Sequence, residues 1–200
     1  MISSQPSLEE LFDHVWGMLV RGGADGRHPY HFPSFATIHN QRGIEQRTVV
    51  LRKADKGKRQ LICYSDMRTR KVAGLAENEQ AHWLFYNHGS KEQIRARVTT
   101  QLHHQDESSN EKWVTIPPKN RGDYLGPVPP GNLTDEHTDN RPVSFKQNPT
   151  EENTQSGYKN FALIVSTVYH LDFLKLSRDG HIRAQFNWRD DKWEKSWVAP

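Results

Sequence analysis

The chain alternates apolar and polar residues over short segments, a period that is typical of half-buried β-strands. Turn residues separate consecutive segments, for example Gln41-Arg42-Gly43 and Arg178-Asp179-Gly180, and indicate antiparallel hairpins. The pattern therefore predicts a mainly β protein with flanking helices, most consistent with an antiparallel barrel. Strands are expected over 34–40, 46–53, 59–65, 81–87, 92–98 continuing to about 106, 161–177 and 181–189, with a last segment at 193–200.

Helical periodicity is confined to three places. Ser7 and Glu10 form a capping-box pattern before an amphipathic helix that Gly22-Gly23 should end. A second helix is expected over 72–78, opened by the basic run 68–71, and a third over about 107–114. The apolar face of the first helix comprises Leu8, Leu11, Phe12, Val15, Leu19 and Val20.

The length of 200 residues favours one domain spanning 1–200. Seven of the 11 prolines lie in 117–149, so residues 117–157 are expected to form a loop-rich excursion. This excursion is either a functional lid or arm, or partly disordered. Only 34% of residues are apolar, which suggests that a partner subunit or a ligand adds to the buried surface.

Positive charge is concentrated in the first half of the predicted sheet. Residues 47–97 hold twelve Lys/Arg and five Asp/Glu, whereas the whole chain has a net charge of only +3. Arg70 and Lys71 open a helix, where backbone N–H groups and the helix dipole favour an anion. Arg47 and Arg52 are five apart on an expected strand, so they should face opposite sides and only one should serve a given site. These features predict an anion site, with a solvated basic turn as the alternative.

Other features exclude whole classes of protein. Cys63 is the only cysteine and is expected to be a buried thiol. No apolar run is long enough for a membrane span, and the N-terminal sequence lacks a signal-peptide pattern, so a cytoplasmic location is expected. His103 and His104 are adjacent on a strand and point to opposite faces, so no metal site is expected. The small net charge and the lack of a nucleic-acid-binding motif disfavour a nucleic-acid partner.

Several short motifs occur together in a fixed order. They are 47–52, Tyr64-Ser65, 68–71, Asn78, 93–98 and the ending 193–200. As an ordered set, over most of 34–104 and 161–200, they resemble the pyridoxamine 5′-phosphate oxidase-like flavoproteins, and the length and ending resemble the uncharacterised FMN-binding oxidase-like branch. The resemblance implies an FMN-binding split β-barrel and a homodimer with FMN in two clefts between the subunits.

The resemblance also assigns residues. Arg47, Arg70 and Lys71 would hold the FMN phosphate, and Gln93 would reach the polar edge of the isoalloxazine. Phe161 stands near the position at which the family has a tryptophan against the cofactor. The remaining positions expected beside the flavin are Val49, Leu51, Arg52, Tyr64, Ser65 and Gln185.

The departures from the family pattern concern the substrate. His181-Ile182-Arg183 stands where the family's oxidases have Arg-x-His, and we expect both residues on one strand face, toward a small-molecule substrate. Gln185 replaces a flavin-contacting arginine, and Arg52 replaces a lysine. Residues 113–120 offer no counterpart of the residues that bind the substrate phosphate, so poor pyridoxamine 5′-phosphate oxidation is expected.

Two functions remain open at this point. One is an FMN-dependent oxidoreductase acting on CH–NH2 or related donors. The alternative is a non-catalytic protein that uses the same barrel to bind or sequester FMN or haem, since the cofactor performs the chemistry and few catalytic side chains are required.

Overall fold

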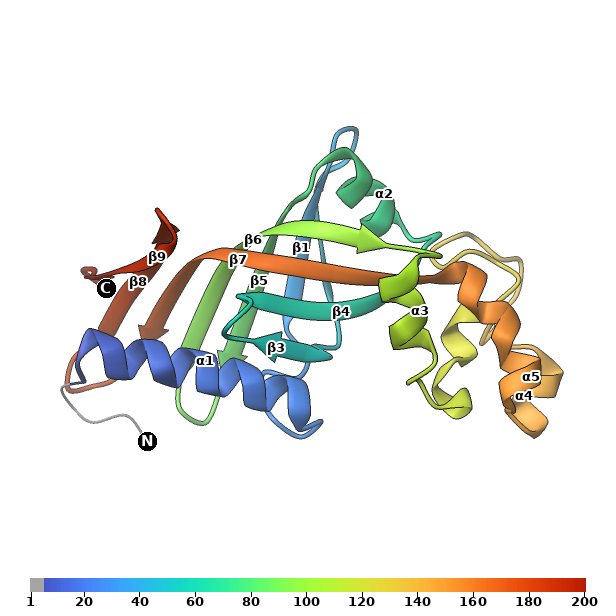
Figure 1. Cartoon of the computed structure of the whole chain (residues 1–200), viewed down its shortest axis with the longest axis horizontal. Helices are drawn as coiled ribbons and strands as arrows, with labels where there is room; N and C mark the ends of the chain where they lie inside the picture. Colours follow the sequence, from blue (N-terminus) through green and yellow to red (C-terminus); the bar gives the residue numbers. More distant parts are fainter. Residues whose placement is uncertain (1–5) are drawn as a thin grey trace.

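One antiparallel sheet forms the centre of the protein, which a computed structural model describes for residues 6–200 (Figure 1). Its order is β2-β1-β5-β6-β7-β4-β3, with β8 added to β7 and β9 to β8. The path does not close within the described residues, so the mainly β class with flanking helices and the split barrel are confirmed. The strands are β1 (Ser34–His39), β2 (Gly43–Thr48), β3 (Lys53–Asp55), β4 (Gln60–Asp66), β5 (Gln80–Asn87), β6 (Glu92–His103), β7 (Phe161–Lys175), β8 (Ile182–Arg189) and β9 (Lys192–Trp197).

The long strand β7 connects two parts of the molecule. On one edge it pairs with β6 along most of its length. On its other edge it pairs with β4 through residues 161–167 and with β8 through residues 170–175. Side chains on β4 and side chains on β8 therefore lie at different ends of the same strand.

Helix α1 (Leu8–Ala24) covers the main core. It begins with the predicted capping box, in which the backbone N–H of Ser7 donates to the Glu10 carboxylate at 2.7 Å. The helix continues through Gly22 and Gly23, contrary to expectation. A Cβ at Gly22 would lie 2.9 Å from the Tyr30 Cβ, so this glycine permits close packing and does not end the helix. Five of the six predicted apolar positions face the core, but Val20 is 42% exposed.

The other helices are short. They are α2 (Arg70–Glu77), α3 (Glu107–Trp113), α4 (Val143–Gln147) and α5 (Glu151–Thr154), with 3-10 turns η1 (Pro118–Asn120), η2 (Gly122–Tyr124) and η3 (Gln155–Asn160). The excursion over 117–157 thus contains several short helices, which lie at the end of the molecule opposite β8 and β9 (Figure 1). Within residues 6–200, none of the helices is long and apolar enough to cross a membrane.

A second, smaller core attaches the excursion to the sheet. Trp113, Ile116 and Tyr124 pack there against Ile62, Phe161 and Leu163 of β4 and β7.

In the main core Cys63 is fully buried, and burial raises the pKa of its thiol to about 12, so it is the inert thiol that the sequence predicts.

The strand predicted over 46–53 is interrupted. β2 ends at Thr48, and the next four residues leave the ladder before β3 starts at Lys53. In this interval the N–H groups of Val49 and Leu51 donate to the carbonyls of Pro33 and His31, at 3.0 and 2.9 Å. The chain therefore bends toward the 31–33 segment. This bend changes the direction of Arg52 relative to Arg47.

Candidate functional site

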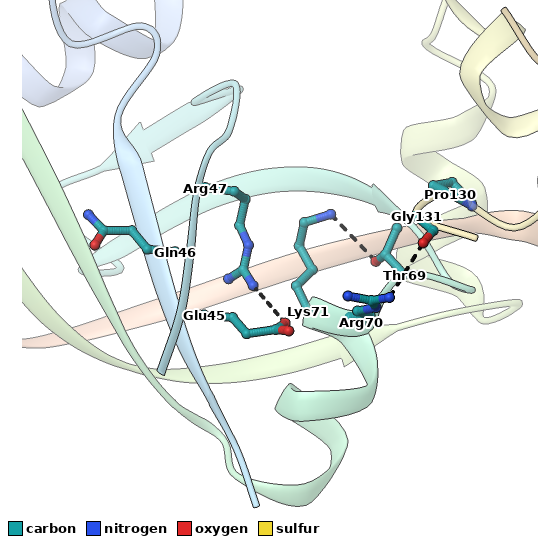
Figure 2. A pocket seen from close by; sticks show the side chains of 8 residues that line it. All are labelled: Glu45, Gln46, Arg47, Thr69, Arg70, Lys71, Pro130 and Gly131. Carbon is teal, nitrogen blue, oxygen red and sulfur yellow. Dashed lines mark hydrogen bonds and ion pairs between the residues drawn. The ribbon is translucent and has the colours of Figure 1, made fainter. Parts of the chain in front are cut away.

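A basic cavity of about 440 Å³ lies between β2, the start of α2 and the loop at Pro130-Gly131. Three of the predicted residues, Arg47, Arg70 and Lys71, line it together. Figure 2 shows Arg47 and Lys71 side by side and Arg70 directed toward Gly131. Glu45, Gln46 and Thr69 complete the walls between them.

Lys71 is half-buried and bonded only to hydroxyls. Its Nζ donates to Ser65 Oγ at 2.9 Å and lies 3.4 Å from Thr69 Oγ1. In the described part of the chain no carboxylate lies within ion-pair distance of this amine. Burial lowers the pKa of Lys71, and the nearby Arg47 lowers it further. An anion at this point would relieve the repulsion between Arg47 and Lys71.

Arg47 is fixed by three contacts on β1 and β2. Its Nη1 donates to Thr37 Oγ1 at 2.8 Å and to the carbonyl of Phe35 at 3.2 Å, and its Nη2 lies 3.3 Å from Glu45. Burial lowers the pKa of Arg47, while Glu45 opposes this shift. The guanidinium is thus held rigidly at the wall of the basic cavity.

The start of α2 adds further donors. Arg70 lies 3.5 Å from the carbonyl of Gly131. The first turn of α2 has no acidic residue, and the side chain of its N-cap residue Thr69 makes no capping hydrogen bond. The unpaired N–H groups of a helix start favour an anion. The basic cavity has three positively charged side chains and one negatively charged side chain, Glu45. This net positive charge and the donors fit a doubly charged phosphate.

An aromatic cavity of about 300 Å³ adjoins the basic cavity. The two share Arg47, Thr69, Lys71 and Pro130 among their lining residues. The further walls of the aromatic cavity include Val49, Arg52, Tyr64, Ser65 and Tyr124. A cationic end thus leads into a slot with an aromatic wall, which suits a phosphate attached to a flat ring system.

The prediction that Arg47 and Arg52 face different sites is wrong, since both line the aromatic cavity. The alternation argument fails because the backbone is not a strand over 49–52. Tyr124, Asp123 and Pro130 also line this cavity, and sequence reasoning missed them. They come from the excursion, about sixty residues beyond Tyr64, and no local pattern indicates their position.

Two predicted flavin neighbours lie beneath the surface. Leu51 is fully buried in the main core. Phe161 is also fully buried, with its ring 5.1 Å from that of Tyr64 at a steep angle. Phe161 therefore supports the Tyr64 wall from behind and does not line the aromatic cavity.

The other predicted residues lie on the face of the sheet near β8. A sheet-face cavity of about 340 Å³ there is lined by Arg95, Arg97, Asp172, Arg183 and Gln185. Gln93 is two residues from Arg95 on β6 and so faces the same side. His181 differs from expectation, because it lies in the turn before β8, where its Nδ1 accepts a hydrogen bond from the Ser177 N–H at 3.2 Å.

Asp172 organises this face from a position that is only 2% exposed. Its carboxylate accepts hydrogen bonds from Arg95, Arg183 and Gln185, the shortest two at 2.8 Å. Burial alone would raise the pKa of Asp172, but the bonds from Arg183 and Gln185 outweigh it and the pKa is lowered. Gln185 thus holds a defined place as a donor to Asp172.

A single chain does not bring together the residues that line the aromatic cavity and those that line the sheet-face cavity. Tyr64 is opposite Leu163 on β7, whereas Gln185 is opposite Asp172. Nine residues of extended strand separate these two positions, a distance of roughly 30 Å. Either the two groups serve different ligands, or a second copy brings them together.

The sequence model described as "Pyridoxamine 5′-phosphate oxidase, FMN-binding domain" matches residues 14–104. Residues 14–104 include every residue that lines the basic cavity apart from those of the Pro130-Gly131 loop. No curated protein matches the chain. The chemistry of the cavity, with its cations, hydroxyls and aromatic slot, agrees with the cofactor that this domain binds.

Several solved structures share the fold. A pyridoxamine 5′-phosphate oxidase-related, FMN-binding protein from Nostoc punctiforme is 18% identical with a TM-score of 0.75, over 99% of this chain and 100% of that chain. PhzG from Burkholderia lata, in complex with tetrahydrophenazine-1-carboxylic acid, is 16% identical with a TM-score of 0.65, over 96% and 90%. A protein from Clostridium acetobutylicum related to general stress protein 26 is 12% identical with a TM-score of 0.51, over 96% of each. Residues 14–104 thus match the FMN-binding domain of the pyridoxamine 5′-phosphate oxidase family, and the chain shares the fold of these solved structures.

Proposed function

We propose that the protein is an FMN-dependent oxidoreductase that acts on a small molecule as a homodimer, with FMN in the clefts between subunits. The observation that carries this proposal is the continuous pair of cavities, in which Arg47 and Lys71 lie at the junction of a cationic end and an aromatic slot. A protein that only required a basic surface would not need a half-buried lysine without a carboxylate partner.

The roles of the chain's residues follow from their positions. Arg47, Arg70 and Lys71 would bind the phosphate, while Val49, Tyr64 and Ser65 would hold the flavin beside the bent 49–52 segment. When bound, FMN supplies hydride acceptance and electron transfer to a further acceptor. The chain's own contribution is to orient the ring and to exclude water from it.

The separation of the two residue groups supports the dimer. Gln93, Arg183 and Gln185 would approach the flavin only if a second copy placed its sheet face against the aromatic cavity. The sheet face is polar, with three arginines along it, two of which pair with the buried Asp172, and this suits a cleft wall better than a hydrophobic core. The cytoplasmic location stays a prediction.

A second candidate is a non-catalytic protein that binds FMN. It is favoured by the lack of a second phosphate site near residues 113–120, where the cations are Lys119 and the flanking Lys112 and Arg121, and Lys112 lines a different cavity. Arg121 is only 1% exposed and pairs with Glu151 at 2.5 Å, so it is not available to a substrate. The same observation strengthens the prediction that pyridoxamine 5′-phosphate is a poor substrate.

The test combines a spectrum with a substrate screen. Purified protein should show a flavin spectrum and release FMN on denaturation, and a reducing substrate should bleach this spectrum under anaerobic conditions. Pyridoxal phosphate formation from pyridoxamine 5′-phosphate should be negligible with FMN-saturated protein. A haem band in place of the flavin would contradict the proposal, and a flavin that no donor bleaches would favour the binding protein.

A further inference from the structure

The loop over 127–139 forms one wall of the basic cavity, although its own backbone does little to hold it there. Three of its first four residues are prolines and have no N–H group to donate. Residues 131–139 are all exposed, and within the described residues no backbone–backbone hydrogen bond joins 127–139 to another part of the chain. Pro130 and Gly131 nevertheless line the basic cavity. A side chain must therefore fix this wall.

The side chain of Asn140 attaches the loop at its base. Its Nδ2 donates to the carbonyl of Val128 at 2.6 Å, and its Oδ1 accepts a hydrogen bond from the Val128 N–H at 3.1 Å. The carboxamide thus satisfies both backbone groups of one residue, as the opposite residue of an antiparallel strand would. We call this pair of hydrogen bonds the Asn140 clasp. It closes the loop over 129–139 into a ring.

The backbone around the clasp is shaped for it. Asn140 has a positive φ of 56°, a conformation that asparagine adopts more readily than most residues with a side chain. Its backbone N–H donates to Thr138 Oγ1 at 2.9 Å. A Cβ at Gly126 would lie 2.3 Å from Asn140 Nδ2, so the carboxamide reaches Val128 only because residue 126 has no side chain.

The clasp is connected to the candidate site in two directions. The carbonyl of Gly126 accepts a hydrogen bond from Arg68 Nη1 at 2.9 Å, and Arg68 pairs with Asp66, which lines the aromatic cavity. In the other direction the chain leads to Gly131, whose carbonyl lies 3.5 Å from Arg70 Nη2. Within the described residues, this carbonyl is the one hydrogen-bond partner of the Arg70 side chain. The position of Gly131 therefore influences where Arg70 directs its charge.

A fixed direction of Arg70 matters for the binding of an anion. Figure 2 shows this side chain directed toward Gly131 at the wall of the basic cavity. Arg70 is exposed, and restricting a free arginine side chain costs conformational entropy when a ligand binds. A partner that restricts the side chain beforehand reduces this cost. The loop supplies such a partner only while its base is closed.

We propose that Asn140 is a positioning residue of the phosphate site, which acts through Gly131 and Arg70. This inference rests on the proposed function, because it takes the bound anion to be the phosphate of FMN. Asn140 lines neither the basic nor the aromatic cavity. Its effect should therefore concern the phosphate and not the flavin ring, and it should vanish when Arg70 is absent.

The experiment measures the binding of FMN and of riboflavin to cofactor-free protein by fluorescence titration. Asn140→Gly removes the carboxamide, and glycine accepts the positive φ, so this variant opens the clasp without straining the backbone. FMN should bind roughly fivefold more weakly or worse, whereas riboflavin, which lacks the phosphate, should change less than about twofold. Unchanged FMN affinity, or an equal loss for both ligands, would overturn the inference.

A second variant opens the clasp from the opposite side. Gly126→Ala keeps Asn140 but places a methyl group where its carboxamide lies, and it should weaken FMN as well. Asn132→Gly is the matched control, since it makes the same substitution in the same loop at an exposed side chain that makes no hydrogen bond within the described residues. An equal loss of FMN affinity in Asn132→Gly and Asn140→Gly would indicate a general effect of loop flexibility and contradict the inference.

A double-mutant cycle separates positioning from a loss of structure. In the Arg70→Ala background, the further change Asn140→Gly should weaken FMN by less than about twofold, because the side chain that the clasp positions is gone. The same loss in both backgrounds would show that the clasp does not act through Arg70. That result would contradict the proposal even if Asn140→Gly alone weakens FMN.

The cycle also distinguishes this inference from the proposed function. If wild-type protein binds no FMN, the proposed function fails. The same cycle with inorganic phosphate as the probe, measured by calorimetry, then still tests the clasp, and absence of phosphate binding would overturn it. If wild type binds FMN and Asn140 is not coupled to Arg70, only the clasp is wrong.

Discussion

At the residue scale, the surroundings of Lys71 favour an anionic ligand over a neutral one. A surface lysine would be solvated, but this one is half-buried between Ser65, Thr69 and Arg47, with hydroxyls as its partners. Burial and a neighbouring cation both lower the pKa of Lys71, and the negative charge of a bound phosphate would oppose this shift. The gain in binding is therefore larger for a charged ligand than for its uncharged analogue.

Replacing Arg70 and Lys71 by alanine should weaken FMN by a hundredfold or more. Each charge-assisted contact contributes on the order of 1.5–3 kcal/mol, and the double variant removes two of them. Fluorescence titration of cofactor-free protein measures the change, and riboflavin, which lacks the phosphate, should bind wild type and variant about equally. The control Arg27→Ala/Lys192→Ala removes the same charge from exposed positions outside the basic and aromatic cavities. Unchanged FMN affinity in Arg70→Ala/Lys71→Ala would show that the phosphate binds elsewhere.

Asp172 should make stability depend on pH. Its pKa is lowered in the folded protein because the bonds from Arg183 and Gln185 outweigh the effect of burial. Its contribution to the free energy of unfolding is thus present above the ordinary Asp pKa of about 4 and is lost as the pH falls through the lowered value.

The variant Asp172→Asn should lose about 1–3 kcal/mol at pH 7. It should also lose less stability than wild type on acidification below about pH 4. Urea unfolding at several pH values measures both effects. Asp179→Asn, at an exposed turn, provides the matched control, and an equal acid response in wild type and Asp172→Asn would contradict the role of this carboxylate.

At the scale of elements, the excursion forms part of the site and is held by one buried arginine. Arg121 donates to the carbonyls of Ile116 and Trp113 at 2.8 and 3.3 Å, pairs with Glu151, and lies 4.7 Å over the Trp113 ring. These contacts connect η1, α3 and α5. Tyr124, three residues beyond Arg121, then forms the wall of the aromatic cavity.

Removing this arginine should loosen the excursion before it unfolds the barrel. Arg121→Ala leaves buried carbonyls unpaired and should cost about 1–3 kcal/mol locally. Hydrogen exchange should accelerate over 117–157 but not over β5 and β6, and FMN should bind more weakly because Tyr124 is displaced. Lys119→Ala, an exposed cation in the same turn, should change neither property. Uniform acceleration across the whole chain would show that the excursion does not open as a separate unit.

The sequence predicted those elements whose determinants are local. The capping box at Ser7, the β1–β2 hairpin and the basic start of α2 each depend on neighbouring residues, and all three are confirmed. The 46–53 strand was wrong because the carbonyls of the 31–33 segment compete for the N–H groups of Val49 and Leu51. The direction of Arg52, and with it one wall of the aromatic cavity, depends on that distant competition.

At the scale of the whole molecule, the site residues fall into two groups at different ends of β7. The family resemblance predicted the residues of both groups. Their separation in one chain follows only from the pairing register of β7, which places β4 and β8 along different halves of this strand. The contribution of Tyr124 and Pro130 was likewise invisible, since it depends on how a proline-rich segment folds back on the sheet. If both groups serve one flavin, the functional unit has two chains.

Sedimentation velocity followed at the flavin absorption maximum tests this most directly. At micromolar protein, the flavin signal should sediment as a species of two chains, with two FMN per dimer. Arg70→Ala/Lys71→Ala should remain a dimer but lose the flavin signal, because its substitutions affect the cofactor and not the sheet face. A flavin signal that sediments with a single chain would contradict the account.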